Sequence, residues 1–152
     1  MPSRRDQIKM TDEEVQGFLA EQMVMQCATV GPSGRPHMVA LWYVPEGLEL
    51  RSWTYAKSQK AKNLERDARA TLGIDDGIQY HELRGVMLEC DVRVERDPER
   101  VAEYGSALVD RYAGGARAAK QAFREQARKR VGLHFVPTRV VSWDHRKLGG
   151  RY

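Results

Sequence analysis

The sequence predicts a mainly β (α+β) protein, namely a six- to seven-stranded antiparallel Greek-key barrel with peripheral helices. Two observations predict this fold class. Short runs that alternate between apolar and polar residues are separated by tight turns, and the helical runs lie in front of the strands or after the third and fifth strand, which fits parallel βαβ units poorly. The 152 residues suit one domain with a single core, so we expect one domain over residues 1–152.

The first elements expected are a helix and three strands. Thr11 and Glu14 form a capping box in front of an apolar helical face, so a short helix should begin here and cover the open end of the sheet. Strands are expected at residues 23–30, 37–44 and 48–55, separated by the Gly- and Pro-rich turns at 31–36 and 45–47.

The second of these strands is apolar on both faces, from Met38 to Tyr43. A sheet with one face in water does not require this pattern. We therefore expect cover on each side, by the barrel interior on one side and by a subunit interface or a flat ligand on the other.

The second half of the chain predicts further helices and long strands. Val86, Leu88, Cys90 and Val92 alternate with polar residues and indicate a half-buried strand. We expect helices at 59–66, 98–112 and about 116–130, strands at 70–75 and 86–95, and a last strand or strand pair at 131–136 and 139–143 that Pro137 interrupts.

A cation-rich segment, residues 57–67, follows the third strand and looks like the start of a helix. Ser58 is a good N-cap, and the free N–H groups of a first helical turn attract anions. Lys60 and Asn63 share one helical face, whereas Lys62 points elsewhere. The segment predicts an anion site centred on Lys60. The alternative is a solvated helix face with Lys62 and Arg66 one turn apart, and no Gly-rich nucleotide fingerprint is present.

Charge and composition exclude several classes of function. Residues 111–152 hold 11 Lys or Arg against 2 Asp or Glu, whereas residues 1–110 hold 14 against 19. Four cations recur at helical spacing in this basic part, but no aromatic residues are interleaved, which argues against nucleic-acid binding. No secretory signal or membrane-spanning run is present, so a cytoplasmic protein without a membrane partner is expected. Neither the two cysteines nor the four histidines show metal-ligand spacing.

Five motifs, in this order, resemble the pyridoxamine 5'-phosphate oxidase-like split β-barrel proteins, and more narrowly the actinobacterial flavin/deazaflavin oxidoreductases of group B. The resemblance covers residues 11–148, and it departs from the family pattern at Ala68 and Cys90. The motifs are Gly34-Arg35-Pro36-His37, Trp42-Tyr43, Lys57-Ser58-Gln59-Lys60-x-x-Asn63-Leu64-x-x-Asp67, Leu83-Arg84-Gly85-Val86 and Ser142-Trp143-Asp144-His145-Arg146-Lys147-Leu148.

The resemblance implies a homodimer with a flavin-type ring in a groove between the subunits and the cofactor phosphate against the 57–67 segment. Coenzyme F420 is the expected cofactor, and FMN is the alternative because the same barrel holds either ring. Trp143 and Lys147 would close the groove from the second subunit. The implied cofactor-binding residues are Val39, Ala40, Leu41, Ser52, Trp53, Thr54, Lys57, Ser58, Lys60, Lys62, Asn63, Trp143 and Lys147.

The function expected from these residues is that of an oxidoreductase. Reduced F420 would pass a hydride to a small unsaturated or electrophilic molecule, with the protein placing the ring and anchoring the phosphate. Two alternatives remain open: a protein that binds or carries the cofactor without turnover, and a nucleic-acid-binding barrel suggested only by the basic tail. No catalytic residue is identified.

Overall fold

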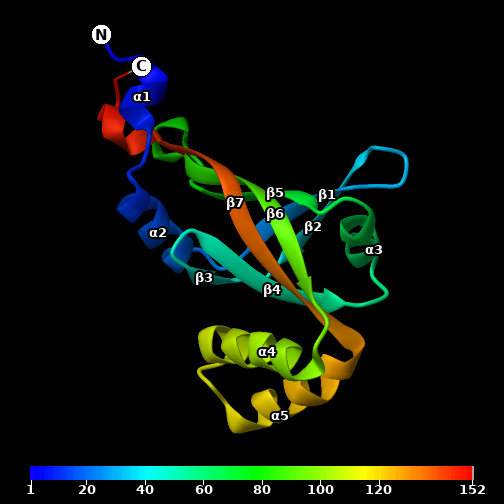
Figure 1. Cartoon of the computed structure of the whole chain (residues 1–152). Coiled ribbons are helices and arrows are strands. Elements are labelled where there is room, and N and C mark those ends of the chain that lie inside the picture. The colour runs from blue at the N-terminus through cyan, green and yellow to red at the C-terminus, as the bar shows by residue number, and fades with distance from the viewer. Residues whose placement is uncertain (152) are drawn as a thin grey trace.

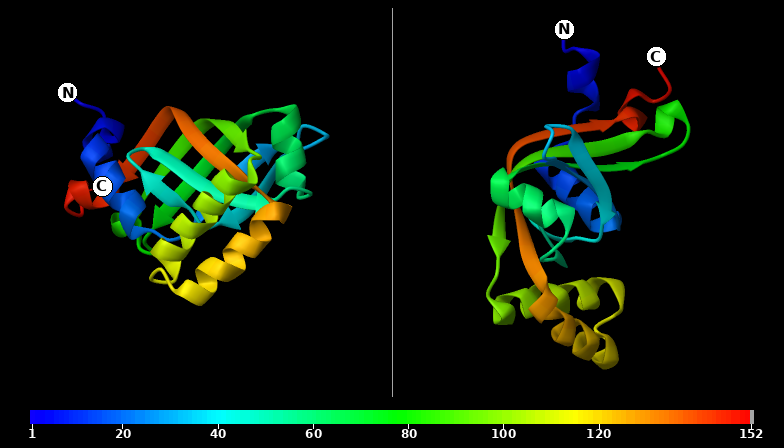
Figure 2. Two further views of the ribbon diagram at one scale, coloured as in Figure 1. Left: turned by 60° about the horizontal axis from the view of Figure 1, so that its bottom comes forward. Right: turned by 90° about the vertical axis from the view of Figure 1, so that its right-hand side faces the viewer.

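The computed structural model of the chain describes residues 1–151, and its centre is a curled antiparallel sheet of seven strands (Figures 1 and 2). The strand order is β2-β1-β5-β6-β7-β4-β3, so the hairpins β1–β2 and β3–β4 form opposite edges. This confirms the predicted split-barrel fold class. The strands are β1 (Met25–Val30), β2 (Pro36–Leu41), β3 (Val44–Glu46), β4 (Glu49–Tyr55), β5 (Arg69–Asp76), β6 (Arg84–Glu95) and β7 (Arg130–Asp144).

Helices lie around the sheet. In Figure 2 (right) α4 and α5 form a pair below the curled sheet, and in Figure 1 α3 and α2 lie on opposite sides of it. No helix of residues 1–151 is long and apolar enough to cross a membrane. The helices are α1 (Arg4–Ile8), α2 (Asp12–Glu21), α3 (Gln59–Arg66), α4 (Pro98–Tyr112) and α5 (Arg117–Gln126), with short 3-10 turns at Tyr80–Glu82, Ala127–Lys129 and His145–Leu148.

The core fills the inside of the curled sheet. The alternation predicted for β6 is confirmed, because Val86, Leu88, Cys90 and Val92 are all buried. Burial of the thiol raises the pKa of Cys90 to about 12, as it also does for Cys27 on β1. The two cysteines are therefore neutral packing residues, as free buried cysteines usually are.

Two strand predictions were wrong about where a strand is interrupted. The run 37–44 is divided into β2 and β3, because Tyr43 turns inward and its hydroxyl donates to Leu19 O (2.7 Å) and Gln22 O (2.8 Å) at the end of α2. The last strand, in contrast, is not interrupted at Pro137. A bulge opposite Glu89 and Cys90 accommodates the proline, so β7 runs unbroken through residues 130–144.

The predicted helix at 116–130 is shorter than expected. α5 ends at Gln126, and a 3-10 turn carries the chain into β7, whose first residue is Arg130. The other helix bounds agree with the sequence pattern: α3 begins after Ser58, and α4 begins with Pro98 at its first position.

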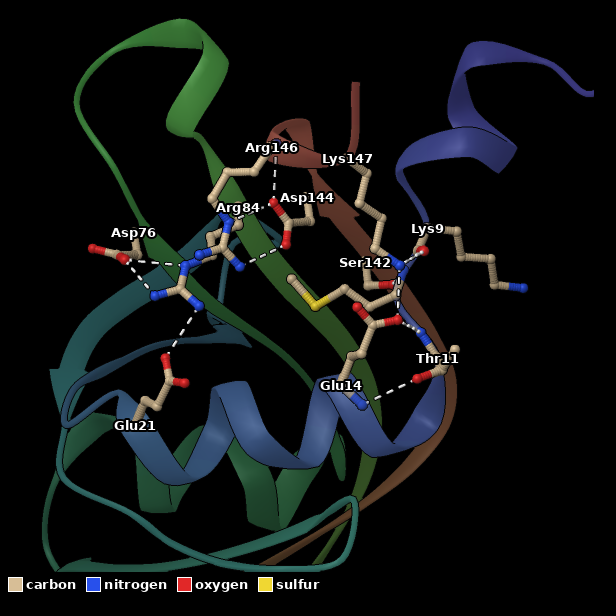
Figure 3. A network of polar contacts seen from close by, with 11 residues as sticks. Lys9, Thr11, Glu14, Glu21, Asp76, Arg84, Ser142, Asp144, Arg146 and Lys147 are labelled. Atoms are coloured by element: carbon tan, nitrogen blue, oxygen red, sulfur yellow. Dashed lines mark hydrogen bonds and ion pairs between the residues drawn. The ribbon is translucent and has the colours of Figure 1, made fainter. Parts of the chain in front are cut away.

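A polar network joins α2 to the C-terminal end of the chain (Figure 3). Lys147 Nζ contacts Glu14 Oε1 (2.7 Å) and Lys9 O (2.9 Å), and Met10 N donates to Ser142 Oγ (3.0 Å). Because Glu14 also accepts from the Thr11 N–H, the predicted capping box and the C-terminal turn share one carboxylate. The network fixes α2 across the sheet.

Candidate functional site

The start of α3 is built as the sequence predicted. The Ser58 hydroxyl accepts from Ala61 N (3.2 Å), which makes it the N-cap, and Thr54 Oγ1 donates to it (3.2 Å). The N–H groups of Gln59 and Lys60 have no acceptor within the described chain, as is usual at a helix start. The first turn of α3 therefore presents free backbone donors.

Lys60 is half-buried, which differs from the alternative interpretation of 57–67 as a solvated helix face. Its Nζ donates to Thr54 Oγ1 (2.8 Å) on β4. Burial is the main cause that lowers the pKa of Lys60, and the charge of Arg130 lowers it further, whereas the nearby Cys27 acts in the opposite direction. The ammonium is thus turned inward to the end of β4.

Arg130, a residue that sequence reasoning missed, lies beside this site. It is the register partner of Tyr55, and its guanidinium lies 3.7 Å from the Tyr55 ring centre and 4.8 Å from that of Trp53. Nη2 donates to Gln126 Oε1 (2.8 Å), and burial lowers the pKa of Arg130 below its usual range. Its sequence position at the end of an expected helix gave no sign of this role.

Neither cation has a carboxylate partner. Among the ion pairs within residues 1–151, none involves Lys60 or Arg130. The charge of Arg130 lowers the pKa of Lys60, so two half-buried cations side by side are electrostatically unfavourable without an anion. We call Lys60, Arg130, Ser58 and the first turn of α3 the cation cluster, and its donor set suits a phosphate group.

Three predicted ligand residues have partners within the chain. Asn63 is fully buried; its amide donates to Thr29 Oγ1 (3.0 Å) and accepts from Gln59 Nε2 (2.8 Å), so its side chain joins α3 to β1 in this structure. Trp53 is buried and stacks on Phe123 of α5. The Ser52 hydroxyl donates to Trp42 O (2.6 Å). These roles depend on neighbours 10 to 70 residues distant in the chain, which local spacing does not reveal.

The β2 residues predicted to line one ring point to opposite faces. Val39 and Leu41 pair with Cys27 and Met25 in register and share their inward direction, and Leu41 packs on the core. Ala40 lies on the outer face instead, so these three side chains cannot contact one ring together. The outer face carries the exposed Met38 and Trp42, the latter stacked on Tyr112 at 4.3 Å between ring centres.

The remaining predicted residues are distributed as follows. Lys57 and Lys62 are exposed, and Thr54 is buried beneath Lys60. Trp143 lies against Gly85, where a Cβ would be only 2.4 Å from its ring, and Lys147 is bound to Glu14. The latter two do not reach the cation cluster of their own chain, and their predicted role in a second subunit stays a prediction.

The grooves of the isolated chain lie away from the cation cluster. One of about 440 Å³ crosses the outer face of β1, β5 and β6, and another of about 770 Å³ lies between α4 and α5. Neither is lined by Lys60, Ser58 or Arg130. The cation cluster therefore lies outside both of these grooves.

Comparison with known proteins gives a family and several similar structures. The family model described as pyridoxamine 5'-phosphate oxidase matches residues 11–144. The conserved hypothetical protein Rv2991 from Mycobacterium tuberculosis is 38% identical, with 99% of this chain and 95% of that chain covered and a TM-score of 0.90. An F420 reductase is 25% identical, with 82% and 94% covered and a TM-score of 0.64. No match was found among curated protein sequences.

A third solved structure resembles the chain in fold alone. HutZ, a heme storage protein from Vibrio cholerae, is 18% identical, with 86% of this chain and 93% of that chain covered and a TM-score of 0.68.

Proposed function

Because the chain belongs to the pyridoxamine 5'-phosphate oxidase family, we propose that it is an oxidoreductase that uses reduced coenzyme F420 to transfer a hydride to a small unsaturated or electrophilic molecule. Support for F420 over other flavin-type cofactors comes from the similarity to an F420 reductase across 82% of the chain. FMN is the alternative within the same class.

The observation that carries the proposal is the cation cluster. Lys60 and Arg130 are half-buried without a carboxylate, beside the free N–H groups of α3. A phosphate ester placed there gains charge-assisted hydrogen bonds and the field of the helix start. Both candidate cofactors carry a phosphate, so the residues present fit either of them.

A place for the ring is the outer face of β1 and β2. Met38 is 64% exposed, and Trp42 and Val24 are each 48% exposed, which is high for large apolar side chains. We propose that a second copy of the chain covers this face, as in the homodimer that the resemblance implied, and that the ring lies between the copies. Such cover excludes water from the reacting face, which hydride chemistry requires.

The chemistry itself comes from the cofactor, which supplies the hydride when bound. The part of this chain is to bind and orient. The cation cluster anchors the phosphate, and the apolar outer face of β2 offers a dry surface to a flat ring. No described residue needs to act as a strong acid in this scheme.

The test is a titration of the purified protein with F420 and with FMN, followed by quenching of cofactor fluorescence. We expect F420 to bind in the micromolar range or tighter. FMN binding without F420 binding would overturn the cofactor assignment. Stopped-flow mixing of the reduced complex with enones, quinones and nitro compounds then tests turnover, and tight binding without accelerated oxidation would favour a carrier.

A further inference from the structure

The helical pair α4–α5 contacts the strand that leads into the cation cluster. Phe123 of α5 stacks on Trp53 with 5.1 Å between ring centres. α4 also approaches so closely that a Cβ on Gly105 would lie 2.5 Å from the same ring. Trp53 thus contacts both helices, and the Arg130 guanidinium lies 4.8 Å from the centre of that ring.

The end of α5 also contacts Arg130 directly. Gln126, the last residue of α5, accepts from Arg130 Nη2 at 2.8 Å. Ala56, which leads into α3, donates to Lys129 O (2.9 Å), so the start of β7 is joined to the approach to α3. Three links therefore set the position of one guanidinium: two aromatic rings and an amide.

These contacts leave part of the hydrogen-bonding capacity of the Arg130 guanidinium unused. Arg130 Nε is buried without an acceptor in the described chain, and no carboxylate pairs with the side chain. A buried donor without an acceptor is unfavourable, and a half-buried charge without a carboxylate partner gains from a nearby anion. A planar guanidinium fork matches the oxygens of a phosphate better than any other side chain.

We propose that the α4–α5 pair is a positioning element for the cation cluster: through Gln126 and the Trp53 ring it holds the Arg130 guanidinium where the cluster binds phosphate. The inference rests on the proposed function in one respect: the natural ligand is taken to be the phosphate ester of the cofactor. The helical pair is then part of the cofactor site rather than an accessory to the sheet.

The experiment compares Arg130→Met, Arg130→Lys and Arg124→Met with the wild type. Methionine keeps an apolar stem over the rings without the charge, lysine keeps the charge without the fork, and Arg124 is an exposed cation on α5 that serves as the control. We expect Arg130→Met to weaken cofactor binding about ten- to a hundredfold and to flatten its salt dependence, Arg130→Lys to lie between, and Arg124→Met to change little.

A second measurement does not need the cofactor. Inorganic phosphate that binds the folded protein raises its melting temperature. We expect this rise in the wild type and in Arg124→Met and a smaller rise in Arg130→Met. Gln126→Leu removes the amide that orients the guanidinium, so it should reduce the phosphate effect while Arg130 remains.

The outcomes separate the two proposals. If Arg130→Met and Arg124→Met weaken cofactor binding equally, Arg130 acts only through its long-range charge and the inference is overturned. It is also overturned if Arg130→Met does not weaken cofactor binding. If neither cofactor binds the wild type, yet phosphate stabilises it in an Arg130-dependent way, the proposed function fails and the inference stands. If phosphate stabilisation is also independent of Arg130, both fail.

Discussion

Lys60 offers the sharpest test of the anion site, because its structural and functional roles predict opposite results. Its ammonium donates to one neutral hydroxyl, Thr54 Oγ1, and has no carboxylate partner in the described chain. Lys60→Met removes the charge and keeps an apolar stem. A charge-assisted contact to phosphate is worth about 1.5–3 kcal/mol, so cofactor affinity should fall about ten- to a hundredfold.

The stability of the free protein should not fall with the cofactor affinity in Lys60→Met. The pKa of Lys60 is lowered in the folded protein, so the unfolded chain binds this proton more strongly, and the charge opposes folding at neutral pH. That penalty is lost as the pH rises from the lowered pKa towards the ordinary value of 10.5. Lys60→Met should therefore leave the melting temperature of the free protein unchanged or raise it.

The assay measures cofactor dissociation constants and melting temperatures for Lys60→Met and for Lys62→Met. Lys62 is exposed on another face of α3 and provides the matched control. A lower melting temperature with unchanged affinity would show that Lys60 serves only the fold. Equal small losses of affinity in both variants would show that α3 presents an ordinary solvated face, and the anion-site argument would be refuted.

Three further predictions concern the fold and the assembly. Arg111 donates to Leu19 O, Gln22 O and Tyr43 O, so Arg111→Met should lower the free energy of unfolding by about 1–3 kcal/mol in urea titrations. Arg117 is exposed, and Arg117→Met should leave this free energy unchanged. Equal effects of the two substitutions would contradict the role of Arg111. Hydrogen bonding from Arg146 lowers the pKa of Asp144, so this carboxylate adds stability above its ordinary pKa of 3.8 that is lost as the pH falls through the lowered value. Between pH 6 and pH 2 the melting temperature of Asp144→Asn should therefore fall less than that of the wild type. The same fall in both proteins would refute the assignment. Met38→Asp on the outer face of β2 should shift sedimentation from dimer to monomer without unfolding the chain, and a monomeric wild type would disprove the proposed dimer face.

Local sequence patterns were sufficient for most elements. The bounds of α3 and α4 follow from Ser58 and Pro98, because an N-cap hydroxyl and an N-terminal proline act within one helical turn. The alternation in β6 likewise gave its buried face, since successive side chains of a strand point to opposite sides. Such signals are carried by neighbours in the chain and need no knowledge of the fold.

Only part of the candidate site could be predicted from local sequence patterns. Ser58 and Lys60 could be identified because the cap and the free N–H groups belong to the same short segment. The contacts of Asn63 with Thr29 and of Trp53 with Phe123 could not be predicted, because these partners lie in elements that the sequence does not place beside them.

The sequence by itself determined most of the strands and helices, the cap of α3 and the family resemblance, all of which depend on contacts within a few residues or on motifs in order. Only the tertiary structure decided which cations meet. Arg130 reaches the cation cluster because β7 pairs with β4 in a register that places it opposite Tyr55, and because α5 ends where Gln126 can hold it. Strand order and register depend on the packing of the whole core, so no local pattern specifies them.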